Sequence, residues 1–311
     1  MPIGSLGDIR VPVELGRENP VASMDCDHGD PAYLKIRDLV YRISGIYHAE
    51  QKLYLVVSAC TRRMMAVCAS SPSEYLEQLT IRPNREAELH MLLNEITIGE
   101  TYMFRHPAQL DALRNVILPQ IMQAKSSLGL KRIRVWSAGC STGEEPYTLA
   151  MFLLEEKQLA GWSFEILATD LNTNSLERAR AGIYGEYSLR NTTEALRRKY
   201  FKDAGNKKLQ ANDLLKSQIR FDRVNLSDDS KMVFLKGYDV VFCCNVLIYF
   251  DLASKRRVVQ HFHTNLLPGG YFFMGHAESL FQVDEAFRLV HFPGATAYWK
   301  QAVSRAEGGK P

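Results

Sequence analysis

A strand-like run that ends at Ala138 leads into the turn Gly-Cys-Ser-Thr-Gly, and two glutamates, Glu144 and Glu145, follow at once. A glycine turn between a strand and a helix is where open α/β sheets bind nucleotide-like ligands. A P-loop would place Gly-Lys-Ser/Thr where these carboxylates stand, and two carboxylates would repel a phosphate. The turn therefore favours a ligand that is cationic at this place. S-adenosyl-L-methionine fits, because it has a sulfonium and an ammonium group but no phosphate.

Three later strand-like runs also end in residues that suit such a ligand. Asp170 ends the run ILATD, where a carboxylate can accept hydrogen bonds from both hydroxyls of a ribose. Asn225 with Leu226, and then Asn245 with Val246, follow the next two runs, where we expect the adenine and the methionyl portion. Each residue alone could be structural, as part of a turn or as a helix cap. Four strand ends that all carry ligand-type residues favour a binding site.

Bringing these residues to one edge requires a sheet, and the apolar pattern predicts one. Over residues 29–98, apolar positions recur at spacings of three and four, with Gly or Pro between the runs, which predicts a helical domain. Over residues 99–303, strand-like runs alternate with helical runs, which predicts an α/β fold with helices on both faces of a parallel sheet. The last two runs, on either side of Pro293 and Gly294, predict an antiparallel hairpin at the sheet edge.

One segment breaks the alternation. Residues 184–218 are too many for a connection between neighbouring elements, which predicts an inserted subdomain. This segment carries eight Lys or Arg against four Asp or Glu, so it is locally basic. Residues 1–28 and 304–311 show no such pattern, and we expect them to be a flexible lead and a flexible tail.

Composition argues against several classes of partner. A formal net charge of +3 does not demand nucleic acid or a membrane, and no aromatic and basic groove for single strands is apparent. The six cysteines include no CxxC pair, so we expect free thiols in a reducing compartment, with neither a metal site nor disulfides. No secretory signal precedes the helical domain, and the apolar run from Tyr238 is too short to span a bilayer. We therefore expect a cytoplasmic protein.

With these motifs in place, the sequence closely resembles the CheR-type chemotaxis receptor methyltransferases. The resemblance spans Tyr33 to Trp299. It is carried by ITIGETYMFR from Ile96, WSAGCSTGEEPYTLAM from Trp136, ATDL from Ala168, FDRVNL from Phe221, CNVLIYFD from Cys244 and LLPGGYFFMGHAESL from Leu266. Together these stretches are highly specific.

The resemblance implies both a fold and an activity. The fold is an all-helical N-terminal domain followed by a Rossmann-like, S-adenosylmethionine-dependent methyltransferase domain, into which a small β subdomain is inserted. The activity is methyl transfer from S-adenosyl-L-methionine to glutamate side chains of methyl-accepting chemoreceptors, which gives methyl esters and S-adenosyl-L-homocysteine in sensory adaptation. The cofactor-binding residues that it implies are Thr101, Arg105, Glu144, Asp170, Asn225, Leu226, Asn245 and Val246.

Two positions leave the cofactor contacts open. Glu145 is a rival to Glu144, because either of two adjacent carboxylates could face the ligand. Gly99 stands where the family usually has Asn, so either the backbone or a water molecule takes over the contact of that side chain.

A glutamate acceptor determines what the catalytic residues must do. Its reference pKa is about 4.3, so at neutral pH it is already an anion and needs no general base. Arg105 could orient this carboxylate with charge-assisted hydrogen bonds, and Tyr249 could add a neutral donor. Alternatively, Arg105 could contact the cofactor's own carboxylate, and Tyr249 could pack against the sheet. We expect His106, His276 and His291 to be satisfied structural residues.

The helical domain offers a basic docking face. Lys52 and Arg63 lie eleven positions apart on one predicted helix and so share a face, and Arg62 is adjacent. This face could steer the acidic cytoplasmic coiled coil of a chemoreceptor, although a solvated face without a partner is the alternative. The inserted subdomain could also add a receptor's C-terminal peptide as a strand. Residues 201–213 have a single glycine rather than a glycine-rich loop, which weakens that expectation.

Two other functions stay open. One is a signalling module that binds S-adenosyl-L-methionine without catalysis. The other is a methyltransferase whose acceptor is a small molecule or nucleic acid. An NAD-linked oxidoreductase is disfavoured, because the turn after Ala138 lacks the spacing that binds a pyrophosphate.

Overall fold

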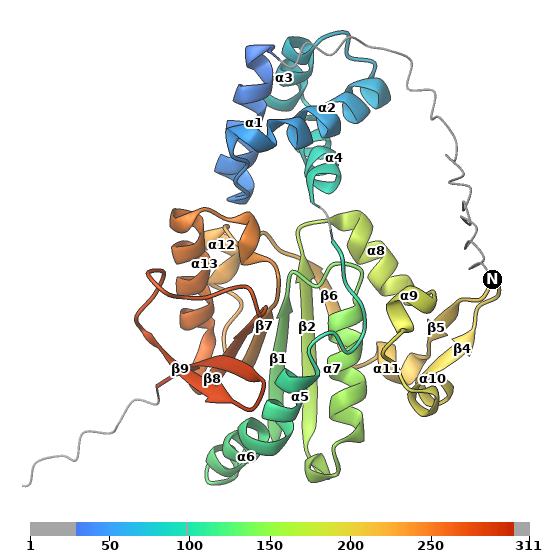
Figure 1. Ribbon diagram of the computed structural model, residues 1–311, viewed down its shortest axis with the longest axis vertical. Coiled ribbons are helices and arrows are strands. Elements are labelled where there is room, and N and C mark those ends of the chain that lie inside the picture. The colour runs from blue at the N-terminus through green and yellow to red at the C-terminus, as the bar shows by residue number, and fades with distance from the viewer. Residues whose placement is uncertain (1–28, 98, 302–311) are drawn as a thin grey trace, which may run out of the picture.

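The computed structural model describes residues 29–97 and 99–301 (Figure 1). A group of helices lies above one edge of a central sheet, and further helices cover both faces of that sheet. The lead and the tail that we predict over residues 1–28 and 304–311 lie outside the described residues.

The N-terminal helices pack around a core of their own. They are α1 (Pro31–Ser44), η1 (Glu50–Lys52), α2 (Leu53–Val67), α3 (Pro72–Thr80) and α4 (Arg85–Ile96). Helix α1 begins after Asp30, whose carboxylate accepts the Ala32 N–H at 2.8 Å and satisfies one of the free donors of the first turn. Apolar side chains from all four α-helices then meet in one buried cluster, which includes Ile36, Val56, Tyr75 and Leu92.

Two expectations about composition can be checked in the described residues. No single helix there is long and apolar enough to cross a membrane, although Glu50–Val67 and Pro72–Thr80 pass that test as a pair that is bent by 79°. The five cysteines among residues 29–97 and 99–301 are free thiols. The sixth, Cys26, lies outside the described part of the chain.

A seven-stranded sheet forms the second domain, with the order β6-β2-β1-β7-β8-β10-β9. Its strands are β1 (Arg132–Ala138), β2 (Ser163–Asp170), β6 (Ile219–Arg223), β7 (Tyr238–Cys243), β8 (Leu266–Met274), β9 (Phe287–Phe292) and β10 (Ala295–Lys300). The first five run parallel, and β9 and β10 form an antiparallel hairpin next to β8. The predicted α/β fold with an edge hairpin is confirmed.

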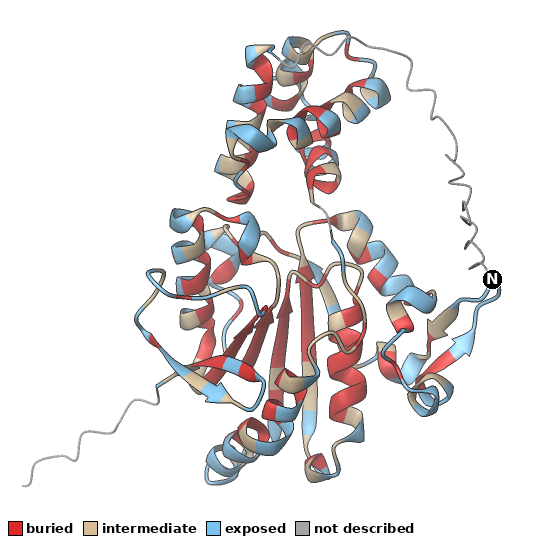
Figure 2. Cartoon of the chain, in the orientation of Figure 1, coloured by how far each residue is buried: buried red, intermediate tan, exposed pale blue. Residues whose placement is uncertain are grey.

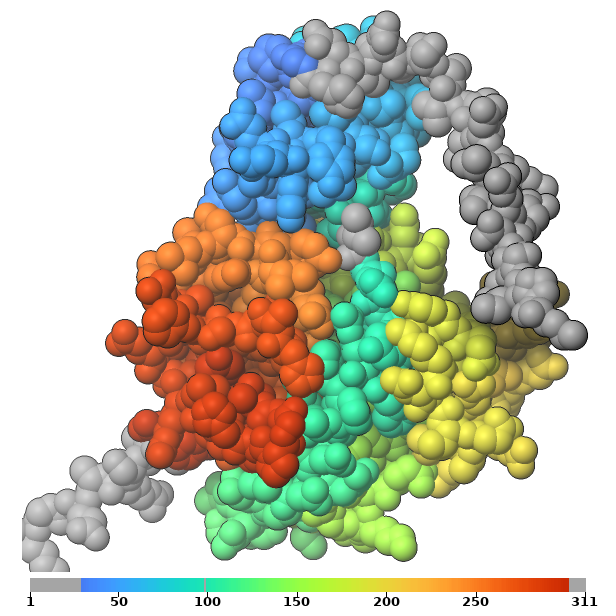
Figure 3. All heavy atoms as spheres, viewed as in Figure 1, coloured from blue at the N-terminus to red at the C-terminus, as the bar shows by residue number. Residues whose placement is uncertain are grey.

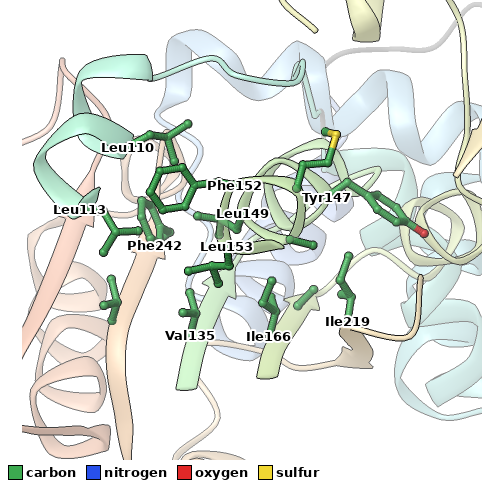
Figure 4. Close-up of a cluster of buried hydrophobic side chains, with 14 of the residues drawn as sticks. Leu110, Leu113, Val135, Tyr147, Leu149, Phe152, Leu153, Ile166, Ile219 and Phe242 are labelled. Carbon is green, nitrogen blue, oxygen red and sulfur yellow. The ribbon is translucent and has the colours of Figure 1, made fainter. Parts of the chain in front are cut away.

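Side chains that alternate along the strands pack against helices on both faces. These helices are α5 (Pro107–Ala112), η2 (Leu113–Ile117), α6 (Leu118–Ser126), α7 (Glu144–Glu155), α8 (Thr173–Ala181), α12 (Asp229–Met232) and α13 (Leu252–Asn265). Val135 points to one face, where it joins Leu149 and Phe152 of α7 (Figure 4). The next residue, Trp136, points to the other face and meets Phe262 of α13 edge to face. The central strands β1, β2 and β7 are accordingly mostly buried, whereas the edge strand β9 and the outer sides of the helices are largely exposed (Figure 2).

The insertion contains a second sheet of three short antiparallel strands, in the order β3-β5-β4. Its elements are β3 (Ile183–Tyr184), α9 (Glu186–Leu189), α10 (Glu194–Tyr200), β4 (Phe201–Asp203), β5 (Leu209–Ala211) and α11 (Asp213–Lys216). In Figure 1 this yellow unit projects from the side of the large sheet beyond α7 and α8.

Hydrogen bonds join the helical domain to the loops that follow the parallel strands. After β2, Asn172 donates its side-chain amide to the carbonyl oxygen of Asn94 at 3.0 Å. After β7, the N–H of Tyr47 donates to the carbonyl oxygen of Tyr249 at 2.9 Å. The carboxyl edge of the sheet is where α/β proteins place their ligands, so the helical domain forms a roof over that edge.

Candidate functional site

A cavity of about 400 Å³ lies between this roof and the carboxyl ends of β1, β2, β6 and β7. Both domains line it. The sequence-predicted residues that line it are Thr101, Arg105, Asp170, Asn225, Leu226, Asn245, Val246 and Tyr249. Strand ends that are scattered along the sequence are thus brought to one site, as the parallel order of the sheet requires.

The turn after β1 forms one wall of the cavity through its backbone. Gly139 has φ of +78° and donates its N–H to the carbonyl oxygen of Thr169 at 2.8 Å. A Cβ added at Gly139 would lie 2.4 Å from Cγ2 of Val246, so glycine is required both for φ and for the close approach of the two loops. This packing brings the turn, with Gly139, Cys140 and Ser141, to the cavity wall.

The two adjacent glutamates face different surroundings. Glu144 is buried away from the cavity, where it accepts hydrogen bonds from Thr142 Oγ1 at 2.6 Å and Ser188 Oγ at 2.8 Å. Glu145 lines the cavity and accepts a hydrogen bond from Ser137 Oγ at 2.7 Å. Glu145 therefore lines the cavity and Glu144 does not, because successive residues on a helix point about 100° apart.

Burial perturbs the carboxylate that faces the cavity. It raises the pKa of Glu145 to about 7, against the opposing effect of the hydrogen bond from Ser137. Burial also raises the pKa of Asp170, although the carboxylate of that residue accepts N–H groups from Ser141 at 2.7 Å and Asn172 at 2.8 Å. A cation placed beside two such groups would favour their charged forms.

Asn225 lines the cavity, and its side chain makes hydrogen bonds within the protein. Its amide donates to the carbonyl oxygen of Ile43 at 2.6 Å, and its carbonyl oxygen accepts the N–H of Ser227 at 3.0 Å. Asn225 thus ties the end of α1 to the loop after β6. Leu226, next to it, is buried and supplies apolar surface to the cavity.

Asn245 is held in a left-handed conformation, with φ of +61°. Its backbone N–H donates to a carboxylate oxygen of Glu278 at 2.8 Å, and Glu278 also accepts N–H groups from Ile248 at 3.1 Å and Gly275 at 2.8 Å. The side-chain oxygen of Asn245 is buried with no hydrogen-bond partner among the described residues. An unpaired acceptor at a cavity wall suits a ligand that brings a donor.

Glu278 holds the loops around Asn245, a role that sequence reasoning did not assign. It lies four positions beyond the end of β8, in the stretch GHAESL, whereas Asp170 is the last residue of β2, so no strand-end pattern marks it. Its role is indirect, since all of its described hydrogen bonds go to the backbone of the loops around Asn245.

The two residues expected to act on the acceptor reach the same cavity from different elements. Arg105 donates from Nη1 to the carbonyl oxygen of Glu100 at 2.7 Å, and its guanidinium lies 5.6 Å from the ring centroid of Tyr102. Tyr249 ends the short helix η4 (Leu247–Tyr249), lines the cavity and is 43% exposed. Thr101 lies beside Arg105 in the chain and also lines the cavity.

Gly99 also lines the cavity, and its neighbour explains the absence of a side chain there. A Cβ at this position would lie 2.1 Å from Oγ of Ser141. An Asn at position 99 would therefore require Ser141 to move. This close approach makes the backbone of Gly99, rather than a substitute side chain, the group that faces the turn after β1.

The histidines differ from expectation in one case. Both ring nitrogens of His106 are buried without a hydrogen bond of good geometry among residues 29–97 and 99–301, and the side chain of Asn245 interacts with the ring and opposes the lowering of its pKa. Burial lowers the pKa of His106 to about 4, which keeps its ring neutral at pH 7. His276 packs edge to face against it, with the ring centroids 5.3 Å apart, whereas His291 is exposed on β9. In the described part of the chain, no group of His, Cys, Asp and Glu is arranged to hold a metal.

The predicted basic face is only partly free. Arg63 makes two hydrogen bonds to the carboxylate of Glu88, at 2.9 and 2.7 Å, and its side chain is 14% exposed. Arg62 pairs with Glu95 at 2.6 Å. Lys52 belongs to η1, before α2 begins, so it does not share a helical face with Arg63 as predicted. It lines the cavity instead.

Family models and known relatives agree with this architecture. The model described as "CheR methyltransferase, all-alpha domain" matches residues 31–97, and "CheR methyltransferase, SAM binding domain" matches residues 99–295. Chemotaxis protein methyltransferase 2 of Vibrio cholerae is 34% identical over 272 residues, which cover 87% of this chain and 93% of that protein. Chemotaxis protein methyltransferase of Borreliella burgdorferi is 35% identical over 244 residues, which cover 78% and 86% of the two chains.

Proposed function

The chain belongs to the CheR methyltransferase family and is an S-adenosyl-L-methionine-dependent methyltransferase of chemotaxis, and from that premise we propose that it esterifies glutamate side chains of chemoreceptors. The observation that carries this proposal is the shared cavity. Acidic groups suited to a cationic cofactor, Glu145 and Asp170, line the same space as Arg105, a cation suited to an anionic acceptor. A donor and an acceptor of opposite charge can therefore be bound side by side.

The residues fit S-adenosyl-L-methionine by their chemistry. Glu145 would hold the positively charged head, and Asp170 would accept from ribose hydroxyls. The unpaired side-chain oxygen of Asn245 would accept from an ammonium group, and Leu226 and Val246 would pack on the flat base. When bound, this cofactor supplies a methyl group activated by a positively charged sulfur.

The protein's own contribution to the reaction is position and exclusion of water. A glutamate acceptor is ionised at neutral pH, because its pKa is about 4.3, so no base is needed to activate it. His106, which is neutral and buried, is consistent with a site in which no residue removes a proton from the acceptor. Orienting the acceptor oxygen and shielding it from water then account for catalysis.

Arg105 is proposed to orient the acceptor carboxylate through its guanidinium, and Tyr249 to donate a hydrogen bond to the same group. Both line the cavity, and Tyr249 lies near its mouth, where it is partly exposed. The competing role for Arg105 is a contact with the cofactor's carboxylate. The two roles differ in their consequence: Arg105→Ala would lower the affinity for S-adenosyl-L-homocysteine in the second case and leave it unchanged in the first.

Receptor docking is proposed at the mouth of the cavity rather than along α2. Lys52 lines the cavity and has no carboxylate partner among the described ion pairs, whereas Arg62 and Arg63 are paired within the helical domain. An acidic coiled coil would meet Lys52 and Arg105 together and be steered by both. Addition of a receptor's C-terminal peptide to the inserted sheet is not needed for this mode of docking.

Methyl transfer to chemoreceptors tests the proposal. The purified protein is incubated with receptor-containing membranes and with S-adenosyl-L-methionine that is labelled in the methyl group. Mild base should then release labelled methanol, because carboxylic esters are cleaved by base and methylated amines are not. Label that survives base would contradict the glutamate acceptor. Receptors lacking their C-terminal residues should be methylated at the same rate.

A further inference from the structure

The segment that carries Thr101 and Arg105 has almost no regular structure of its own. It runs from residue 99 to residue 106, between α4 and α5, without a helix or a strand. Phe104 within it has φ of +54°, which is unfavourable for a side chain with a Cβ. A strained segment keeps one conformation only when neighbouring elements fix it.

The inserted subdomain supplies much of that support. The N–H of Met103 donates to the carbonyl oxygen of Ser188 at 2.9 Å, and the hydroxyl of Tyr187 donates to a carboxylate oxygen of Glu100 at 2.6 Å. In Figure 3 the teal surface of the chain just beyond residue 99 lies directly against the yellow surface of the insertion. Helix α9 and the turn after it therefore contact the binding segment, not only their own small sheet.

Arg190, just after α9, connects the two parts most closely. Its guanidinium lies 3.4 Å from the ring centroid of Tyr102 and 3.9 Å from that of Tyr187, so it is placed between the two rings. It also donates to the carbonyl oxygen of Tyr187 at 2.7 Å. The ring of Tyr102 is the same ring that Arg105 approaches at 5.6 Å.

Both described anchors of Arg105 are thus held by the insertion. Its hydrogen bond goes to the carbonyl oxygen of Glu100, whose side chain is held by Tyr187. Its aromatic neighbour is Tyr102, whose ring is held by Arg190. We propose that Tyr187 and Arg190 are positioning residues for Arg105, so that the inserted subdomain takes part in catalysis independently of any receptor peptide. This inference rests on the proposed function, in which Arg105 orients the acceptor.

A role in folding alone does not account for Arg190. Leu189, Tyr200 and Leu215 of the insertion belong to the same buried cluster as Tyr147 and Leu149 of α7, so the insertion is anchored to the large domain without Arg190. Arg190 is exposed, and its described contacts go to Tyr102 and Tyr187. Replacing it with alanine should therefore leave the fold in place.

Kinetics of Arg190→Ala and of a matched control test the proposal in the full chain. The control is Arg198→Ala, because Arg198 lies in the same subdomain, is 78% exposed and pairs only with Glu194 among the described ion pairs. We expect Arg190→Ala to lower kcat about tenfold, since small misplacement of an orienting group is costly. The dissociation constant for S-adenosyl-L-homocysteine, the melting temperature and the kcat of the control should not change. Tyr187→Phe should lower kcat in the same direction.

A double-mutant cycle with Arg105→Ala identifies the route of the effect. If Arg190 acts through Arg105, then adding Arg190→Ala to Arg105→Ala causes no further loss of kcat. Losses that multiply in the double variant, or an unchanged kcat in Arg190→Ala, overturn the inference while leaving the proposed function intact. Full kcat in Arg105→Ala alone overturns the proposed role of Arg105, and the inference with it.

Discussion

The side-chain amide of Asn225, in the loop after β6, donates to the carbonyl oxygen of Ile43 in α1 at 2.6 Å. The bond joins two residues that are 182 positions apart and belong to different domains. It lies beside a second bond of the same kind, from Ser227 Oγ to the carbonyl oxygen of Ser44 at 3.0 Å. The roof of the cofactor cavity is therefore fastened to the sheet by a residue that the sequence suggested as a ligand contact.

Asn225→Ala should loosen this roof without unfolding either domain. The loss of one partly buried hydrogen bond, which leaves the Ile43 carbonyl without this partner, costs about 1 kcal/mol locally. Hydrogen exchange measured by mass spectrometry should show faster exchange in peptides from the end of α1 and little change in the core strands. Equal exchange in the parent and the variant would show that the bond does not hold the roof.

Gly139→Ala should block the site through the close approach of two loops. The added Cβ would lie 2.4 Å from Val246, and φ of +78° is unfavourable for alanine. Gly129→Ala is the matched control, because Gly129 has φ of +71° but nothing within 4 Å of the added Cβ. Calorimetric titration with S-adenosyl-L-homocysteine should detect no binding to the first variant and normal binding to the second. Equal affinities would disprove the steric argument.

Glu145 and Glu144 should differ when each is replaced. Glu145→Gln removes a negative charge from the cavity wall. At pH 8 it should weaken the binding of S-adenosyl-L-methionine by at least about tenfold, because one charged contact is lost. Glu144→Gln changes a residue that bonds Thr142 and Ser188 outside the cavity, so its affinity should stay within about twofold. Titration calorimetry of both variants decides between them, and the opposite order would restore Glu144 as the ligand contact.

Cofactor affinity should depend on pH through Glu145. Burial raises its pKa to about 7, so the carboxylate is increasingly neutral below that pH and attracts a cation less. Binding should weaken by up to about tenfold per pH unit below 7, because one pKa unit corresponds to 1.36 kcal/mol. The profile of Glu145→Gln should be flat over the same range. A flat profile in the parent protein would contradict the assignment.

The raised pKa of Glu145 also affects folding stability. Cofactor affinity should rise with pH, whereas folding stability should fall. The folded pKa of Glu145 exceeds the unfolded value of about 4.3, so the stabilisation from its bound proton is complete below that value and is lost as the pH rises through 7. Glu145→Gln should therefore raise the melting temperature relative to the parent at pH 8, by less at pH 5. Scanning calorimetry at both values measures this difference.

The order of elements and the position of the site could be predicted from the sequence, because both depend on local patterns. Apolar alternation defines the strands, and ligand-type residues at strand ends, such as Asp170 and Asn245, must meet wherever the strands are parallel. The direction of a side chain depends on contacts that are distant in sequence. Nothing local shows that Asn225 bonds Ile43, or that Ser188 of the insertion holds Glu144 away from the cavity.

Charge counts overstated the unpaired positive charge of the predicted docking face for the same reason. Arg63 is basic in sequence, but Glu88, 25 positions later, pairs with it across two helices. The role of Glu278 was also missed, because its partners are backbone N–H groups, which leave no pattern in the sequence. Contacts between segments that are distant in sequence can therefore be identified only from the structure, even where the motifs are clear.

Identifying the methylated residue tests the central claim most directly. A chemoreceptor fragment is incubated with the purified protein and S-adenosyl-L-methionine, digested, and analysed by fragmentation mass spectrometry. The account predicts an added methyl group on glutamate side chains of the receptor coiled coil with the parent protein, and a much lower yield with Arg105→Ala. Methylation on lysine, arginine or histidine, or equal yields from the two proteins, would contradict it.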